Sequence, residues 1–256
     1  SLAVHNLIYQ ILKQDVCAGF MPSKLWRYIA FDDVPSDLAN ELGRTLRQNK
    51  YEFRPLLERM FLSREFYSTE SAYGQIKSPV QWLVGSCIAL DAPLPNADAC
   101  GMILRSLGQE LFAPPNVKGW IGGFSWITTA SLMQRYNLAG FLVKGSGDML
   151  GRKTNNEDMM MQAMTEMRPQ ARERASLRSM PSLADADRIL PAGKRTSKEE
   201  VWAFLEWRLY QRKLDEAHTK AARDYLDGLP EPGGWTPDQV RDLVHVMMCT
   251  PYYQVC

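Results

Sequence analysis

Apolar residues recur every three or four positions along most of this chain, which is the spacing that places them on one face of an α-helix. The stretch 2–12 shows this pattern most simply, at Val4, Leu7, Ile8, Ile11 and Leu12. No stretch alternates apolar and polar residues over several positions, as a half-buried β-strand would. The pattern therefore predicts an all-α fold, arranged as a multi-helical orthogonal bundle.

Helix starts are marked by Ser or Thr followed three positions later by Glu or Gln, the capping-box pattern. Such boxes occur at 78–81, 197–200 and 236–239. The helix behind the first box, 80–90, is apolar nearly all round and is expected to be the most buried element. Pro22 fits the first turn of another helix, where its missing N–H costs little.

Three regions of different composition define the expected organisation of one domain. Residues 1–148 should form a helical core with an ordered Gly/Pro/Trp loop at 108–128. Residues 149–196 are rich in Met and charged side chains and are broken by prolines, which predicts a flexible insertion. Residues 197–256 should form a C-terminal helical hairpin that packs on the core.

The stretch GQELFAPPNVKGWIGGFSWITTASLMQRYN, residues 108–137, organises the chain because it ends one helix, forms a loop and starts another. Gly108 is well placed as the C′ residue of the first helix. Indole rings are costly to leave in water, so Trp120 and Trp126 should anchor the loop to the helices. We expect one of the two to be buried and the other partly exposed.

The same stretch holds the candidate ligand-binding residues. These are Asn116, Lys118, Trp120, Trp126, Arg135 and Asn137. Aromatic faces flanked by hydrogen-bonding groups can hold a ligand such as a sugar. In the alternative interpretation, both indoles are only anchors and the polar groups bond the loop backbone. Polar side chains that converge on a cleft would support a binding site.

The charge and composition of the chain limit the kinds of partner that it is expected to bind. The 30 Lys and Arg nearly balance the 29 Asp and Glu, so no overall field attracts nucleic acid. The longest apolar run, 82–90, is far shorter than the roughly 20 residues that cross a bilayer, so no transmembrane segment is expected. The five cysteines form no CxxC pair, and His245 with Cys249 lacks further ligands. Neither a metal site nor a cofactor is therefore expected.

No catalytic motif occurs in the chain. It has no HExxH, no phosphate-binding loop and no GxGxxG after a strand. Residues 123–127 begin like a nucleophile elbow but lack its second glycine and the preceding strand. No catalytic residue is assigned.

Several motifs resemble a bacterial family known as domain of unknown function 1800. Pro-Pro-Asn-Val-Lys-Gly-Trp-Ile-Gly-Gly followed by Trp-Ile-Thr-Thr-Ala-Ser-Leu-Met-Gln-Arg-Tyr-Asn-Leu-Ala is similar to the signature of that family. Shorter matches are Lys-Leu-Trp-Arg at 24–27, Leu-Ser-Arg-Glu-Phe at 62–66, Lys-Ser-Pro-Val at 77–80 and Leu-Gly-Gln at 107–109. The chain departs from the family at Ile121, where Pro is frequent, and at Thr128, where Asn is common.

The resemblance implies a helical protein of a kind that is often exported, so a periplasmic or secreted location is expected. Family members are usually longer at the N-terminus, and this chain is expected to lack roughly its first half. No activity is established for the family, so no catalytic residue carries over. The expected function is a binding or assembly role without catalytic apparatus in this fragment, with a protein or an oligosaccharide as partner. The alternative is a hydrolase, for example one acting on polysaccharide, whose catalytic residues lie in the missing N-terminal half.

Overall fold

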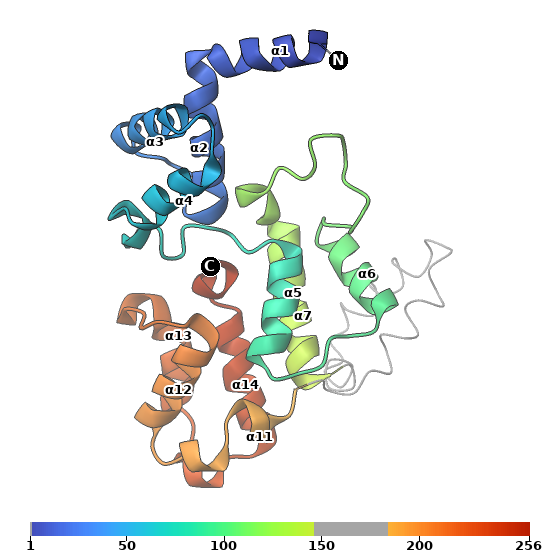
Figure 1. Cartoon of the computed structure of the whole chain (residues 1–256). Coiled ribbons are helices and arrows are strands. Elements are labelled where there is room, and N and C mark those ends of the chain that lie inside the picture. The colour runs from blue at the N-terminus through green and yellow to red at the C-terminus, as the bar shows by residue number, and fades with distance from the viewer. Residues whose placement is uncertain (1, 146–183) are drawn as a thin grey trace. The chain divides into compact units, whose positions relative to one another are not determined.

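The computed structural model describes residues 2–145 and 184–256, which fold into α- and 3₁₀-helices without a β-strand (Figure 1). The all-α prediction is confirmed. The chain divides into two compact units, Ser1–Gln75 with Val255–Cys256 (unit 1) and Ile76–Gln254 (unit 2). This division differs from the single core expected over 1–148, because the buried apolar side chains form two separate clusters.

Unit 1 contains the first four α-helices and a short 3₁₀-helix. Their bounds are α1 (Leu2–Lys13), α2 (Asp15–Ile29), α3 (Ser36–Gln48), α4 (Phe53–Phe61) and η1 (Glu65–Tyr67). α2 packs on α3, and α3 packs on α4. Trp26 of α2 is completely buried between these helices and meets the rings of Phe31 and Phe66 edge-to-face, with ring centroids 5.5 and 6.4 Å away. This indole is the centre of the core of unit 1.

Pro22 lies inside α2 rather than in its first turn, so that prediction is wrong. A proline in a helix interior removes a backbone hydrogen bond and costs about 3 kcal/mol or more. Ala18, Pro22 and Trp26 are spaced four residues apart and are all buried. Burial of this continuous face against the core therefore offsets the cost of the proline.

The apolar face of α1 is a helix face, as its spacing predicted, but it is not buried. Val4, Leu7, Ile8 and Ile11 are each at least half exposed. Periodicity determines that such a stretch becomes a helix, whereas its burial depends on which other surface meets it.

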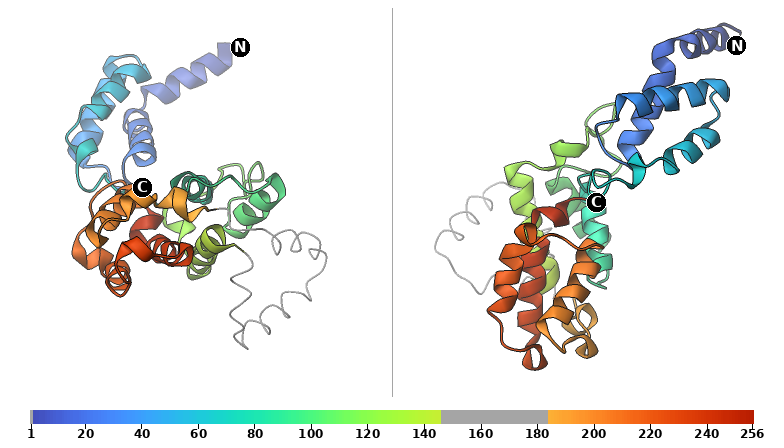
Figure 2. Two further views of the ribbon diagram at one scale, coloured as in Figure 1. Left: turned by 90° about the horizontal axis from the view of Figure 1, so that it is seen from below. Right: turned by 90° about the vertical axis from the view of Figure 1, so that its left-hand side faces the viewer.

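Unit 2 contains the remaining described helices. They are α5 (Pro79–Ala89), α6 (Ala97–Ser106), η2 (Gly123–Trp126), α7 (Thr129–Lys144), α11 (Ala186–Ile189), η3 (Ala192–Lys194), α12 (Lys198–Tyr210), α13 (Glu216–Asp227), η4 (Pro232–Gly234), α14 (Pro237–Met248) and η5 (Pro251–Gln254). α14 packs against α7, α11, α12 and α13, and Figure 2 shows the orange helices next to the red α14.

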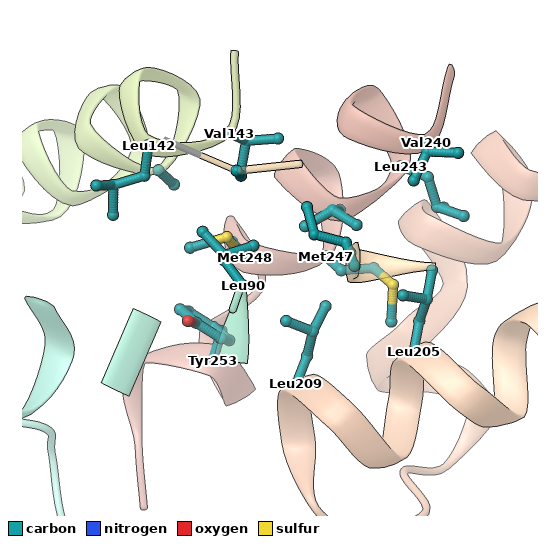
Figure 3. Close-up of a cluster of buried hydrophobic side chains, with 14 of the residues drawn as sticks. Leu90, Leu142, Val143, Leu205, Leu209, Val240, Leu243, Met247, Met248 and Tyr253 are labelled. Carbon is teal, nitrogen blue, oxygen red and sulfur yellow. The ribbon is translucent and has the colours of Figure 1, made fainter. Parts of the chain in front are cut away.

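The core of unit 2 joins α5, α7, α12 and α14. In the close-up of Figure 3, Leu142 from α7 and Leu209 from α12 point toward Met247 and Met248 of α14. α7 and α14 approach closely at Gly140 and His245. A Cβ at position 140 would lie only 3.2 Å from the imidazole, so glycine permits this approach. Residues more than 100 positions apart therefore build one core.

Two of the three predicted capping boxes are confirmed. Ser78 accepts from the N–H of Gln81, whose side chain accepts from the N–H of Ser78, and the box at 236–239 is built in the same way. Ser197 only accepts from the N–H of Glu200, whose carboxylate bonds Thr196 instead. The third box is therefore a plain N-cap.

The described residues include the end of the expected flexible insertion and all of the expected C-terminal hairpin. Residues 149–183 lie outside the described residues, but 184–196 form α11 and η3, with Ile189 and Leu190 completely buried. Burial of those two apolar side chains stabilises the segment, although prolines and charged residues lie next to it in the sequence. The predicted hairpin is incomplete, since α13 lies between α12 and α14, with Asp215 as its N-cap.

Candidate functional site

The central loop leads from the end of α6 to the start of α7 (Figure 1). α6 ends as predicted: Gly108 adopts a φ of 90°, which L-residues with a side chain rarely adopt. The N–H groups of Gly108 and Gln109 donate to the carbonyls of Arg105 and Leu104, at 3.0 and 2.8 Å. The chain then makes a long excursion and returns through η2 to α7.

Trp126 anchors the returning end of the loop. Its side chain is 7% exposed, and the Ser131 hydroxyl donates to its carbonyl at 2.9 Å. Thr128 caps α7 by accepting from the N–H of Ser131 at 3.1 Å, while the Ser131 hydroxyl accepts from the N–H of Thr128 at 2.9 Å. Trp120 is partly buried. The expectation of one buried and one partly exposed indole is confirmed.

Arg135, predicted as a ligand-binding residue, lies in the interior of unit 2. Its side chain is completely buried, and its guanidinium donates to the Lys77 carbonyl at 2.8 Å and to Gln254 Oε1 at 3.5 Å. Among the described residues no partner pairs with its Nε atom. Burial lowers the pKa of Arg135 to about 10, so the group remains a cation at neutral pH.

Three further residues join Arg135 in what we call the Arg135 cluster: Lys77, Tyr253 and Gln254. Lys77 donates to the Tyr253 carbonyl at 2.8 Å, with its ammonium 4.3 Å from the centre of that ring. Gln109 Oε1 accepts from the N–H of Val80 at 3.1 Å, in the first turn of α5. Segments that are separate in the sequence therefore meet at the start of α5, and their polar groups bond one another.

The other polar candidates are exposed and do not join this cluster. Asn116 Oδ1 accepts from the N–H of Lys118 at 2.8 Å, and the Asn116 carbonyl accepts from the N–H of Gly119 at 3.0 Å, which closes a turn. Lys118 and Asn137 are exposed. Of the six candidates, Trp126 and Arg135 are thus buried and Trp120 is partly buried, while the remaining three are exposed.

The middle of the loop displays apolar side chains that the sequence reasoning did not select. Phe112, Val117, Ile121 and Phe124, which we call the loop tip, are between 81% and 105% exposed. Single exposed apolar residues are ordinary, but four large ones on one loop are not. A usable signal was present in the sequence: large apolar residues set among prolines and glycines, in a stretch with no Asp or Glu from position 111 to position 145.

Phe112 also has an unusual backbone. Its φ is 64°, in the left-handed region, where a bulky residue is an outlier. Such conformations cost about 1–3 kcal/mol, and they are concentrated at functional sites. The loop therefore holds a solvated aromatic ring in a backbone conformation that glycine would adopt more easily.

His245 and Cys249, the other pair considered for chemistry, lie between α7 and α14. His245 Nε2 is 3.1 Å from the Tyr136 carbonyl, which requires the proton on Nε2. Burial lowers the pKa of His245, and burial raises the pKa of Cys249 to about 11, so the thiol stays protonated at neutral pH. Both groups are held in their neutral forms by packing.

No group of three or more His, Cys, Asp and Glu side chains that could hold a metal ion occurs among the described residues. None of the helices formed by residues 2–145 and 184–256 is both long and apolar enough to span a membrane.

The fold and the site define a class of helical protein in which a loop exposes apolar side chains. The helix that follows this loop is bonded to other segments by the polar groups of the Arg135 cluster. Comparison with protein families assigns the chain more closely. Residues 2–255 match the family described as "Protein of unknown function (DUF1800)", and the chain belongs to this family. No curated protein and no solved structure matches the chain.

Proposed function

We propose that unit 2 is a binding module and that the loop tip is its contact surface. The observation that carries this proposal is the near-complete exposure of Phe112, Val117, Ile121 and Phe124 on one loop. Several fully exposed apolar side chains on one loop mark a site of association, because contact with a partner removes them from water.

The base of the loop supports the same proposal. Trp126 is enclosed, and Gln109 bonds the start of α5, so both ends of the loop are attached to helices. A loop that is held before it meets its partner loses less conformational entropy on binding. The strained backbone at Phe112 is consistent with selection for display of the ring.

The exposed chemistry favours an apolar partner over an oligosaccharide. A sugar stacks on an accessible indole face and bonds the polar groups around it. Trp126 is enclosed, and Arg135 is bonded in the interior. The indole of Trp120 is only partly exposed, and the four most exposed apolar side chains of the loop are aliphatic and phenyl groups, which attract apolar surface.

We further propose that the protein acts in the periplasm or after secretion. This part rests on the family resemblance alone. Fractionation of the host cell with an antibody to the protein tests it, and recovery with cytoplasmic markers would contradict it.

A photo-crosslinking amino acid at position 117 tests the binding function in the native host. We expect an adduct of discrete mass, formed with a protein or with lipid. The matched control carries the same group at exposed Glu216 on α13, away from the loop. If position 117 gives no more adduct than position 216, the binding function is wrong.

A further inference from the structure

We infer that the loop tip inserts into the headgroup layer of a lipid membrane. This inference rests on the proposed binding function and names its partner. Three features of the loop carry it: the way in which each apolar side chain protrudes, the charge of the loop, and the bonding of its backbone.

The apolar side chains of the tip protrude separately. Each of Phe112, Val117, Ile121 and Phe124 is surrounded by solvent on nearly all sides, so neighbouring side chains cover little of any of them. A protein partner would need a closely complementary surface to pack around four such projections. Fluid acyl chains and headgroups adapt to separate projections, as they do around apolar residues of membrane-surface segments.

The charge of the loop matches a membrane surface. Lys118 is the one charged residue between positions 111 and 128, and its side chain is exposed. A cation next to apolar side chains is attracted to the anionic lipids of a bilayer, and no carboxylate between positions 111 and 128 opposes that approach. Trp120 is partly buried beside it, and Trp is enriched at the level of lipid headgroups.

The backbone of the loop is suited to shallow insertion. Pro114 and Pro115 carry no N–H, so the loop has fewer donors to remove from water. The N–H groups of Ala113, Lys118 and Ser125 are bonded within turns of the loop, at 2.8 to 3.2 Å. Backbone groups that remain without partners cannot enter the hydrocarbon core, which limits insertion to the headgroup region.

Flotation with vesicles tests this inference on the full chain. The probes are vesicles of phosphatidylcholine alone and vesicles with one third phosphatidylglycerol. We expect the chain to float with both, and more strongly with the anionic vesicles. The double variant Phe112→Ser/Ile121→Ser should bind vesicles at least about tenfold more weakly, because two apolar side chains no longer enter the headgroup layer.

The matched control is Trp207→Ser/Ile88→Ser, which removes an aromatic ring and an isoleucine that are exposed on helices of unit 2. This variant should bind vesicles like the unchanged chain. Lys118→Glu should weaken binding to the anionic vesicles severalfold and leave binding to phosphatidylcholine unchanged. Circular dichroism and thermal unfolding confirm that the variants remain folded.

The possible results separate the inference from the function beneath it. Absence of flotation, or equal flotation of the tip variant and the control variant, overturns the lipid inference. If position 117 then crosslinks to a discrete protein or to a second copy of this chain, the binding function stands with a different partner. If neither vesicles nor crosslinks detect a contact, both proposals are wrong.

Discussion

The two ends of the central loop and its middle have opposite environments. At the base, Trp126 and Arg135 are enclosed, and the polar groups of the Arg135 cluster bond one another. At the tip, Phe112 and Ile121 stand in solvent. The difference indicates that the base determines the shape of the loop and that the tip is available for a partner. Substitutions at the base should therefore change stability, and substitutions at the tip should change binding.

The largest expected effect on stability is in α5, which begins two residues after Lys77 of the Arg135 cluster. Trp82 is 1% exposed, so Trp82→Ala should lower the free energy of unfolding by about 3–5 kcal/mol through lost contacts and a cavity. Urea unfolding followed by circular dichroism measures this change. The control is Trp207→Ala at an exposed indole, which should stay within about 0.5 kcal/mol. Equal losses at both positions would mean that α5 is not part of the core.

Arg135 is expected to have the next largest effect. Arg135→Ala leaves a cavity and removes the N–H groups that donate to the Lys77 carbonyl and to Gln254 Oε1. It should lower the free energy of unfolding by about 2–4 kcal/mol. Arg135→Met keeps much of the volume and should cost less. Lys118→Ala, the matched control for an exposed cation of the loop, should change stability by less than about 0.5 kcal/mol. If Arg135→Ala unfolds like Lys118→Ala, Arg135 does not hold the base.

A smaller effect of pH is expected where α7 packs on α14. Burial lowers the pKa of His245 below its ordinary 6.5, and the charge of Lys144 acts in the same direction, while Asp242 and the bond to Tyr136 oppose it. The unfolded chain therefore binds a proton at this site before the folded chain does, as pH falls below 6.5. Stability should be complete above that pH and should decrease as pH falls through the lower, folded-state value.

The measurement is the free energy of unfolding at several pH values from about 7.5 to 5, for the unchanged chain and for His245→Gln. The variant keeps a side-chain donor for the Tyr136 carbonyl but no longer titrates. The stability of the variant should depend less on pH in this range. The difference between the two proteins should be smaller than the effect of Trp82→Ala or of Arg135→Ala. A parallel pH dependence in both proteins would assign the titration to other groups.

The smallest effect on stability is expected at the tip. Phe112→Gly removes a ring that is exposed, so no core contact is lost. Glycine also adopts the positive φ of this position without strain. The free energy of unfolding should remain unchanged or rise by up to about 1 kcal/mol. A loss above about 1 kcal/mol would show that the ring supports the fold, which would remove the contrast between base and tip.

Local sequence signals were sufficient for the helix boundaries around the loop and not for the environment of its side chains. Gly108 ends α6 and Ser78 begins α5 as expected, because caps act within four residues. Arg135 was predicted to face a ligand and is buried instead. Ser131, Arg135 and Ala139 lie four residues apart on a face of α7 that is buried in the structure. Sequence alone could not supply the partners of the guanidinium, because Lys77 and Gln254 are 58 and 119 positions away.

The amino-acid sequence by itself determined that this chain is helical, where most helices begin, and which family it resembles. Hydrophobic spacing, caps and glycines act between neighbours in the chain, so they can be recognised without the fold. The tertiary structure alone decided that the apolar face of α1 and the loop tip stay exposed while Arg135 is enclosed. Burial depends on which distant segments meet, and that is a property of the packed chain rather than of any single stretch.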